Sequence, residues 1–264
     1  MDTELAAKVD AKISDNIGVI TLNNPRKRNA LSTKLINDLC AALEAMREHE
    51  VRVVILRAAP GAKVFSSGHD VRELPTNGRD PMTYNDPLRR VVRTIELFPA
   101  PVVAMIEGSV WGGACELVMS CDLIVAAEDC TFAVTPAKIG MPYNISGVQN
   151  FLSTAGMLLC KEMLFTAQPL PVKRLLDRGI VSHAVPREQL EALTMGIAEQ
   201  ISNNSPLVMG LLKEELRLLS IPHNLGPETF ERVQAMRRQV YDSEDYQEGI
   251  RAFLEKRSAQ FQGR

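Results

Sequence analysis

The 264-residue chain is 45% hydrophobic and 23% charged and carries a formal net charge of −2, the composition of an ordinary globular protein. Its near-neutral charge argues against nucleic-acid binding, which needs a basic surface. The polar start MDTELAAKVD lacks a signal-peptide pattern, and no uninterrupted apolar run approaches the roughly 18 residues of a membrane span, so we expect a cytoplasmic protein without membrane contact.

The first 60 residues predict two strands and a helix. Residues 10–22 alternate between apolar and polar side chains, which fits a strand or a hairpin turning at Asp15-Asn16. After the loop NNPRKRNAL, Ser32 can cap a helix whose apolar residues fall on one face as far as Met46. The β-branched run at 51–58 predicts a buried strand.

The alternation continues to about residue 127. The polar segment 75–87 predicts a loop, and the apolar spacing from Leu88 to Phe98 predicts a helix that ends before Pro99. Two further buried strands, 101–108 and 122–127, flank a helix that begins at the glycines of VWGGACELVMSC. Strands that alternate with helical crossovers predict an α/β fold with parallel strand pairing.

From about Pro186 the pattern predicts helices only. We therefore expect residues 1–195 to form a core and residues 196–264 to form a C-terminal helical region.

The cysteines and histidines are scattered, and neither set suggests a metal site. There is no CxxC pair, which favours reduced thiols over a disulfide framework or a zinc site, and no two histidines have paired spacing. The residues concerned are Cys40, Cys115, Cys121, Cys130, Cys160, His49, His69, His183 and His223.

Two loops share one design, in which a buried strand leads to a turn of small residues and then to a helix. They are FSSGHD, at 65–70, and SVWGGACE, at 109–116. Glycine in such turns lets a ligand approach the backbone closely, so two of them at one sheet edge can direct two N–H groups at one oxygen. Tight packing turns are the alternative, and the spacing alone does not decide between them.

The combination of motifs resembles the crotonase (enoyl-CoA hydratase/isomerase) superfamily over nearly the whole chain. KVFSSGHDVREL, PVVAMIEGSVWGGACE, EDYQEGIRAFLEKR and NPRKRNALS each match a segment of that family. The resemblance implies a crotonase fold, a spiral of ββα units with a C-terminal helical trimerisation region. It also implies an acyl-CoA substrate, no cofactor, and a homotrimer or dimer of trimers.

The resemblance assigns the two oxyanion donors to the backbone N–H groups of His69 and Gly113. The His69 ring therefore need not be the catalytic group. A ring that packs against CoA or shapes the pocket is the interpretation we favour over a catalytic base.

The chain departs from the hydratases of this family at one carboxylate. Hydration needs two carboxylates to activate and deliver one water. Glu116 matches the first, but Ala137 stands after Pro136 where the second would be. Decarboxylation needs an oxyanion hole and an oriented carboxylate, for which Tyr143 and Thr135 are candidates, or else they simply line the pocket wall.

The role of Glu116 stays open at this point. An anion beside the departing carboxylate would repel it, so Glu116 is protonated, points away, or helps to destabilise the bound carboxylate. For the proton that reaches the enolate, the candidates are water and Tyr143.

Substrate contacts are expected from the basic loop 26–28 and from the last helix, with solvated surface charge as the alternative. Trp111 is either core filler or part of the wall beside the acyl group. The candidate substrate- and CoA-binding residues are Arg28, Ala30, Ser67, Gly68, Asp70, Val71, Thr135 and Lys256.

We therefore expect a metal- and biotin-independent lyase that decarboxylates a malonyl-type CoA thioester, with methylmalonyl-CoA giving propionyl-CoA as the first candidate. The alternative within the family is hydration or isomerisation of an enoyl-CoA with Glu116 as the sole acid or base. A non-catalytic assembly or RNA-binding protein would need a basic surface or degenerate oxyanion loops, and the sequence has neither.

Overall fold

The computed structural model describes most residues of the chain. They are 8–73, 86–139, 143, 145–220, 227–228, 231–232, 235, 239, 242–255, 257 and 259–264. No helix among them is long and apolar enough to cross a membrane. Residues 75–85 of the predicted loop at 75–87 lie outside the described residues. Lys256 lies outside them too.

Ten described strands form two sheets, and the larger sheet is mostly parallel. Its six strands run in the order β1-β2-β3-β5-β7-β10, and only the β1–β2 hairpin is antiparallel. The hairpin turns at Asp15 and Asn16, which both have positive φ, as the sequence predicts. The strands are β1 (Val9–Ser14), β2 (Ile17–Leu22), β3 (Val53–Ala58), β5 (Val102–Ile106), β7 (Leu123–Ala127) and β10 (His183–Val185).

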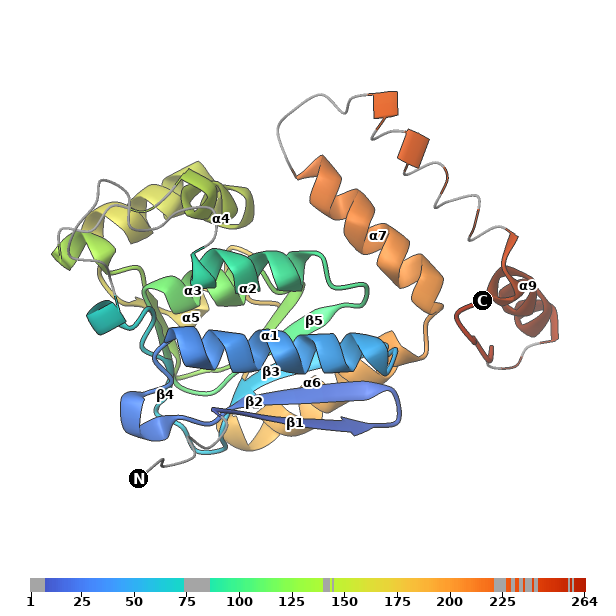
Figure 1. Ribbon diagram of the computed structural model, residues 1–264, viewed down its shortest axis with the longest axis horizontal. Helices are drawn as coiled ribbons and strands as arrows, with labels where there is room; N and C mark the ends of the chain where they lie inside the picture. The colour runs from blue at the N-terminus through green and yellow to red at the C-terminus, as the bar shows by residue number, and fades with distance from the viewer. Residues whose placement is uncertain are drawn as a thin grey trace.

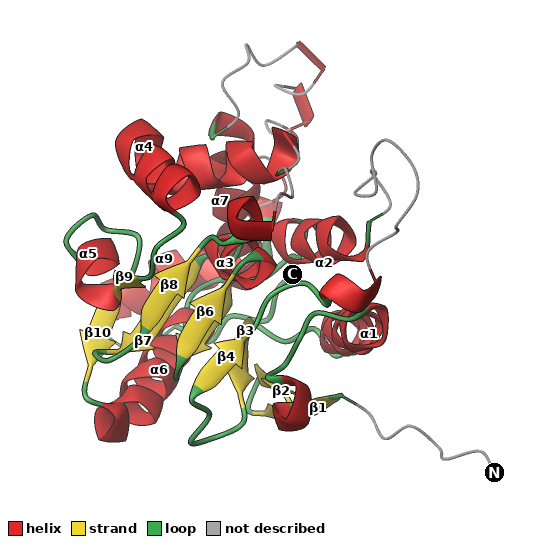
Figure 2. Ribbon diagram, turned by 90° about the vertical axis from the view of Figure 1, so that its left-hand side faces the viewer, coloured by secondary structure: helices red, strands yellow, loops and turns green. Residues whose placement is uncertain are grey.

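The smaller sheet consists of short strands in the order β4-β6-β8-β9. Figure 2 shows β4, β6 and β8 side by side in front of the larger sheet. From β3 to β8, successive strands alternate between the two sheets, so that β3-β4-α2, β5-β6-α3 and β7-β8-α4 are three turns of a ββα spiral. The strands are β4 (Val64–Ser66), β6 (Ser109–Trp111), β8 (Thr131–Ala133) and β9 (Leu170–Pro171).

Helices cover the sheets through their apolar faces. Ser32 caps the first helix by accepting a hydrogen bond from the Leu35 N–H at 3.3 Å, as predicted, and that helix packs against β1, β2 and α2 (Figure 1). Gly156 has φ 70° and ψ 166°, which kinks α4. These helices are α1 (Thr33–Glu48), α2 (Pro87–Glu96), α3 (Gly113–Met119), α4 (Ile145–Thr166) and α5 (Val172–Leu176), with 3-10 turns η1 (Pro25–Lys27), η2 (Val71–Glu73) and η3 (Pro136–Ile139).

The C-terminal part is helical where it is described: α6 (Arg187–Ser202), α7 (Pro206–Leu219) and α9 (Glu244–Glu255). α6 packs across β3, β5 and β7, whereas α7 and α9 extend to one side of the sheets in Figure 1. The boundary predicted between residues 195 and 196 falls within α6, and the division into domains stays a prediction.

Candidate active site

The two glycine loops meet at the end of the smaller sheet. β4 pairs with β6 in parallel, so the turns that follow these strands lie side by side. A Cβ atom added to Gly68 would lie 3.1 Å from the Gly113 nitrogen, and one added to Gly113 would lie 3.7 Å from the His69 nitrogen. Gly68 has φ +82° and Gly112 has φ +54°, the left-handed region that favours glycine.

The amides of His69 and Gly113 are both available in this arrangement. Within the described part of the chain, neither is a donor in the hydrogen bonds of turns, loops and helix caps, whereas the Gly112 N–H donates to the Ala133 carbonyl at 2.7 Å. Gly113 opens α3, where the first N–H groups of a helix lack intrahelical partners. Two unused donors close together are what an oxyanion hole requires.

Buried polar groups hold the first loop in place. The Asn29 side chain donates to the Phe65 carbonyl at 2.9 Å, and the Ser66 hydroxyl donates to the Asn29 carbonyl at 2.7 Å. Ser66 also accepts from the Gly68 N–H at 3.2 Å, and the Leu31 N–H donates to the Gly68 carbonyl at 2.8 Å. Sequence reasoning missed Asn29 and Ser66, although each lies inside one of the four motifs that carry the family resemblance.

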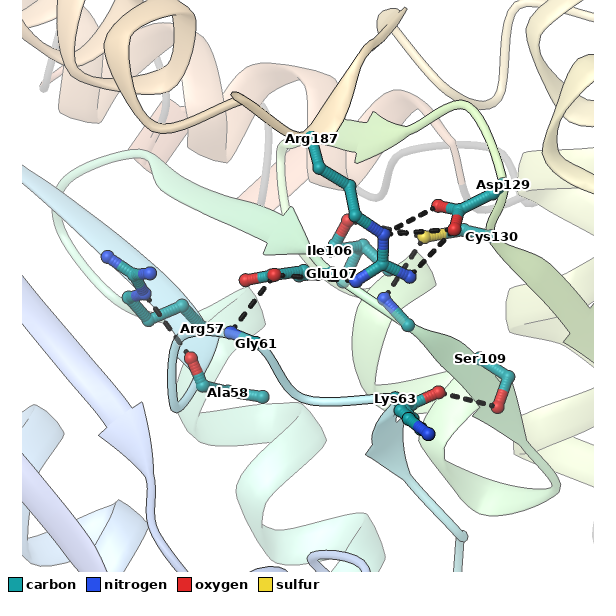
Figure 3. A network of polar contacts seen from close by, with 11 residues as sticks. Arg57, Ala58, Gly61, Lys63, Ile106, Glu107, Ser109, Asp129, Cys130 and Arg187 are labelled. Atoms are coloured by element: carbon teal, nitrogen blue, oxygen red, sulfur yellow. Dashed lines mark hydrogen bonds and ion pairs between the residues drawn. The ribbon is translucent and has the colours of Figure 1, made fainter. Parts of the chain in front are cut away.

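A second network holds the corner between β5 and β6 (Figure 3). Arg187 pairs with Asp129 at 2.9 Å and with Glu107 at 3.4 Å, and the Glu107 carboxylate accepts from the Gly61 N–H at 3.0 Å. The Cys130 thiol accepts from the Gly108 N–H at 3.2 Å. These contacts fix Glu107 and Gly108, where the chain passes from β5 of the larger sheet to β6 of the smaller sheet, just before the Trp111-Gly112 turn.

Glu116 lies one turn into α3 and is fully buried. Its Oε1 atom is 2.6 Å from an Arg89 nitrogen of α2, and its Oε2 atom has no hydrogen-bond partner among the described residues. Burial raises the pKa of the Glu116 carboxyl, against the opposing effect of Arg89. Sequence analysis did not identify Arg89, because nothing in the spacing links residues 27 positions apart on different helices.

Tyr143 packs against the same carboxyl. Its hydroxyl is 3.5 Å from the Gly112 carbonyl, and its ring meets the Phe151 ring edge-on at 5.2 Å. A Cβ atom on Gly147 would lie 2.6 Å from the Tyr143 ring and 2.9 Å from Glu116 Oε2. Burial raises the pKa of Tyr143 well above its usual range, so its hydroxyl stays protonated as a donor.

The segment after β8 borders the second loop. Thr135 Oγ1 would lie 3.8 Å from a Cβ atom on Gly112, which puts this hydroxyl beside the oxyanion loop. Ala137 and Lys138 are exposed in η3. By the family resemblance, the second carboxylate of a hydratase would stand at Ala137, whose side chain is a methyl group.

Several of the expected CoA-binding residues lie in or beside the first loop. Arg28 is exposed, and its carbonyl accepts from the Ser67 N–H at 2.9 Å; Ala30 is buried. Val71 is 55% exposed, a large apolar side chain left open to a ligand.

Asp70 is buried and takes part in the loop's own structure. Arg72 donates to both Asp70 oxygens, at 2.8 and 2.6 Å, and these bonds lower the pKa of the carboxyl. The His69 Nδ1 atom is buried and has no partner within the described residues. The described residues also hold no cluster of three or more side chains suited to a metal ion.

Comparison with known proteins identifies the family. The enoyl-CoA hydratase/isomerase family model matches residues 12–264. The chain belongs to the enoyl-CoA hydratase/isomerase family. It is 51% identical over 249 residues to the methylmalonyl-CoA decarboxylase of Escherichia coli K12, covering 94% of this chain and 95% of the relative.

Solved structures of the family have the same fold. One is a methylmalonyl-CoA decarboxylase in complex with 2-nitronate-propionyl-CoA, with 50% identity, a TM-score of 0.80, and coverage of 97% of this chain and 99% of the other. An enoyl-CoA hydratase from Bacillus anthracis has 28% identity and a TM-score of 0.84, with coverage of 97% and 100%. The predicted crotonase fold and family are thus confirmed.

Proposed function

We propose that this protein decarboxylates methylmalonyl-CoA, or a closely related malonyl-type CoA thioester, to propionyl-CoA and CO2. The observation that carries the proposal is the pair of unused amides at His69 and Gly113 in a site where Ala137 replaces the second carboxylate of a hydratase. The 51% identity to a protein named methylmalonyl-CoA decarboxylase supports it.

The chemistry follows from where charge develops. The thioester oxygen accepts hydrogen bonds from the His69 and Gly113 amides. When the C–C bond to the carboxylate breaks, its electron pair enters the thioester to give an enolate, whose oxygen the two amides stabilise. Each donor of this kind contributes about 3 kcal/mol to transition-state stabilisation.

Tyr143 and Thr135 hold the substrate carboxylate perpendicular to the thioester plane. Their support is their position beside Gly112, with the Tyr143 hydroxyl 3.5 Å from the Gly112 carbonyl. Orientation matters because the breaking bond must overlap the carbonyl π system for the enolate to form. The His69 ring shapes the pocket rather than acting as a base.

CoA binds along the first loop and the last helix. Lysine and arginine suit its phosphates, and exposed apolar surface suits its pantetheine arm. The residues proposed for this role are Arg28, Ala30, Ser67, Gly68, Asp70, Val71 and Lys256.

The reaction needs neither biotin nor a metal, because the thioester is itself the electron sink. We propose a homotrimer or dimer of trimers; exposed apolar side chains on α4, 78% exposed at both Leu158 and Phe165, support an interface there. A cytoplasmic location stays a prediction.

Hydration or isomerisation of an enoyl-CoA is the second candidate, favoured by the buried carboxyl of Glu116 beside the oxyanion loop. A single carboxyl can move a proton but cannot both activate and deliver a water. A non-catalytic assembly or RNA-binding role lacks support, because the net charge is −2 and both oxyanion loops are intact.

The proposal is tested by incubating the purified protein with methylmalonyl-CoA in the presence of a chelator and avidin, and by counting CO2 and propionyl-CoA. We expect the two products in a ratio of one to one. No propionyl-CoA, or activity that the chelator or avidin abolishes, would contradict the proposal.

A further inference from the structure

The direction of the His69 amide depends on a second segment, residues 28–31, which runs beside the first loop. Leu31 and His69 form an isolated parallel β-bridge. The Leu31 N–H donates to the Gly68 carbonyl at 2.8 Å, and the Asp70 N–H donates to the Leu31 carbonyl at 3.4 Å. Because the residue at the centre of such a bridge directs its own peptide groups to the opposite side, the His69 N–H points away from segment 28–31.

The open side of this bridge is the side of the second glycine loop. A Cβ atom on Gly113 would lie 3.7 Å from the His69 nitrogen. The register between the first loop and segment 28–31 therefore decides whether the two amides can reach the same oxygen.

A buried hydroxyl ties the two segments together. Ser66 is fully buried, and its hydroxyl donates to the Asn29 carbonyl at 2.7 Å. The same oxygen accepts from the Gly68 N–H at 3.2 Å. Ser66 thus connects segment 28–31 to the peptide group one residue before the His69 amide.

Asn29 completes the connection from the other segment. It is 2% exposed and has φ 50°, a left-handed conformation that asparagine adopts more readily than most residues. Its side chain accepts from the Asn24 N–H at 2.8 Å and donates to the Phe65 carbonyl at 2.9 Å. Each of these side-chain hydrogen bonds ends on a backbone group, so Asn29 and Ser66 act on the position of the loop.

We propose that Ser66 and Asn29 are positioning residues of the oxyanion hole, which hold the His69 N–H in line with the Gly113 N–H. Both act through the backbone of the first loop. This inference rests on the proposed decarboxylase function.

A small displacement of the His69 amide is costly, because a hydrogen bond weakens steeply as its geometry departs from the optimum. Loss of an oxyanion donor lowers kcat by about 10² to 10³, and misplacement of a group by about 1 Å costs about 10²-fold. Gly68 increases the need for outside ties, since glycine adopts many backbone conformations at little cost.

The first variant is Ser66→Ala in the full-length protein, which removes both hydrogen bonds of the hydroxyl. We expect kcat with methylmalonyl-CoA to fall by about tenfold to 10²-fold, while KM changes by less than about threefold, because the donor acts in the transition state. Asn29→Gly also removes the side-chain bonds and keeps the left-handed backbone conformation, so it should give the same pattern. It serves as the test if Ser66→Ala does not fold.

An infrared measurement separates positioning from a general loss of stability. Propionyl-CoA with an isotope label at the thioester carbonyl is bound to each protein, and the stretching band of that carbonyl is recorded. Two aligned donors polarise the carbonyl and move its band to a lower wavenumber than in free propionyl-CoA. In Ser66→Ala and Asn29→Gly we expect the band to lie closer to its position in free propionyl-CoA.

Thr194→Val is the matched control. Thr194 of α6 is fully buried, and its hydroxyl donates to the Leu190 carbonyl at 2.7 Å, the same distance as the bond from Ser66. This helix packs across β3, β5 and β7. We expect the control to lower the denaturant midpoint, because a buried hydrogen bond is lost, and to leave both kcat and the carbonyl band native.

Native kcat in Ser66→Ala and Asn29→Gly would overturn the proposal. A native carbonyl band would overturn it too, even with a lower kcat, because the donors would then still be aligned. If the native protein forms no propionyl-CoA from methylmalonyl-CoA, the proposed function fails instead. The carbonyl band then still tests the alignment, since it requires binding of propionyl-CoA but no turnover.

Discussion

Removal of one oxyanion donor gives the sharpest test of the site. Gly113 is the first residue of α3, a position where proline fits the helix but has no N–H. Gly113→Pro should lower kcat by about 10² to 10³, because a single oxyanion donor contributes about 3 kcal/mol to the transition state.

Gly113→Ala is the matched control, since it adds the same Cβ atom and keeps the N–H. That atom would lie 2.7 Å from the Leu88 Cδ2 atom, a flexible side-chain end that must move. Both variants should therefore lose stability by about 1–3 kcal/mol from overpacking, measured as a lower denaturant midpoint. The ratio of kcat between the two variants then isolates the missing donor.

Steady-state kinetics with methylmalonyl-CoA provide the assay. The proline ring also occupies the space of the amide hydrogen and can obstruct substrate binding. Such obstruction raises KM, whereas loss of a donor used in the transition state lowers kcat, so the two effects are separated. Equal kcat for Gly113→Pro and Gly113→Ala would refute the assignment of this amide to the oxyanion hole.

Four further outcomes follow from the same geometry. Tyr143→Phe should lower kcat by about tenfold or more with KM nearly unchanged, because an orienting hydroxyl acts on the reacting carboxylate; an unchanged kcat would return Tyr143 to the pocket wall. His69→Ala should be mild, within about tenfold in kcat/KM, since only its backbone donates; a loss as large as that of Gly113→Pro would assign the ring a catalytic role. Gly147→Ala should lower kcat and, to a smaller degree, thermal stability, because its Cβ atom would press on the Tyr143 ring at 2.6 Å and on Glu116 at 2.9 Å. A native-like kcat would show that neither group needs its present position. An ionised Glu116 would repel the substrate carboxylate and burial raises its pKa, so kcat should be highest below that raised pKa and fall as the pH rises through it, whereas a pH series of Glu116→Gln should show no such fall.

Much of the fold follows from local patterns. The hairpin turn at Asp15-Asn16, the Ser32 cap and the buried strands β3, β5 and β7 were predictable, because turn chemistry, capping and apolar runs each act over a few residues. The strands β4, β6 and β8 were not predicted, because three residues are too few to show a period.

The site shows the same division. Its loops are visible in the sequence as glycine turns, but their meeting depends on the parallel pairing of β4 with β6, in which Val64 lies opposite Ser109. The Arg89–Glu116 ion pair joins two helices through tertiary packing, and no periodicity within either helix encodes it.

One measurement addresses the central claim directly. The purified protein is given methylmalonyl-CoA and crotonyl-CoA together at equal concentration, without added metal or biotin, and the CoA products are identified by mass spectrometry over time. The account predicts propionyl-CoA as the dominant product, with crotonyl-CoA left almost unchanged. Hydroxybutyryl-CoA as the dominant product, with methylmalonyl-CoA intact, would mean that Glu116 alone supports hydration and that the missing second carboxylate does not define the reaction.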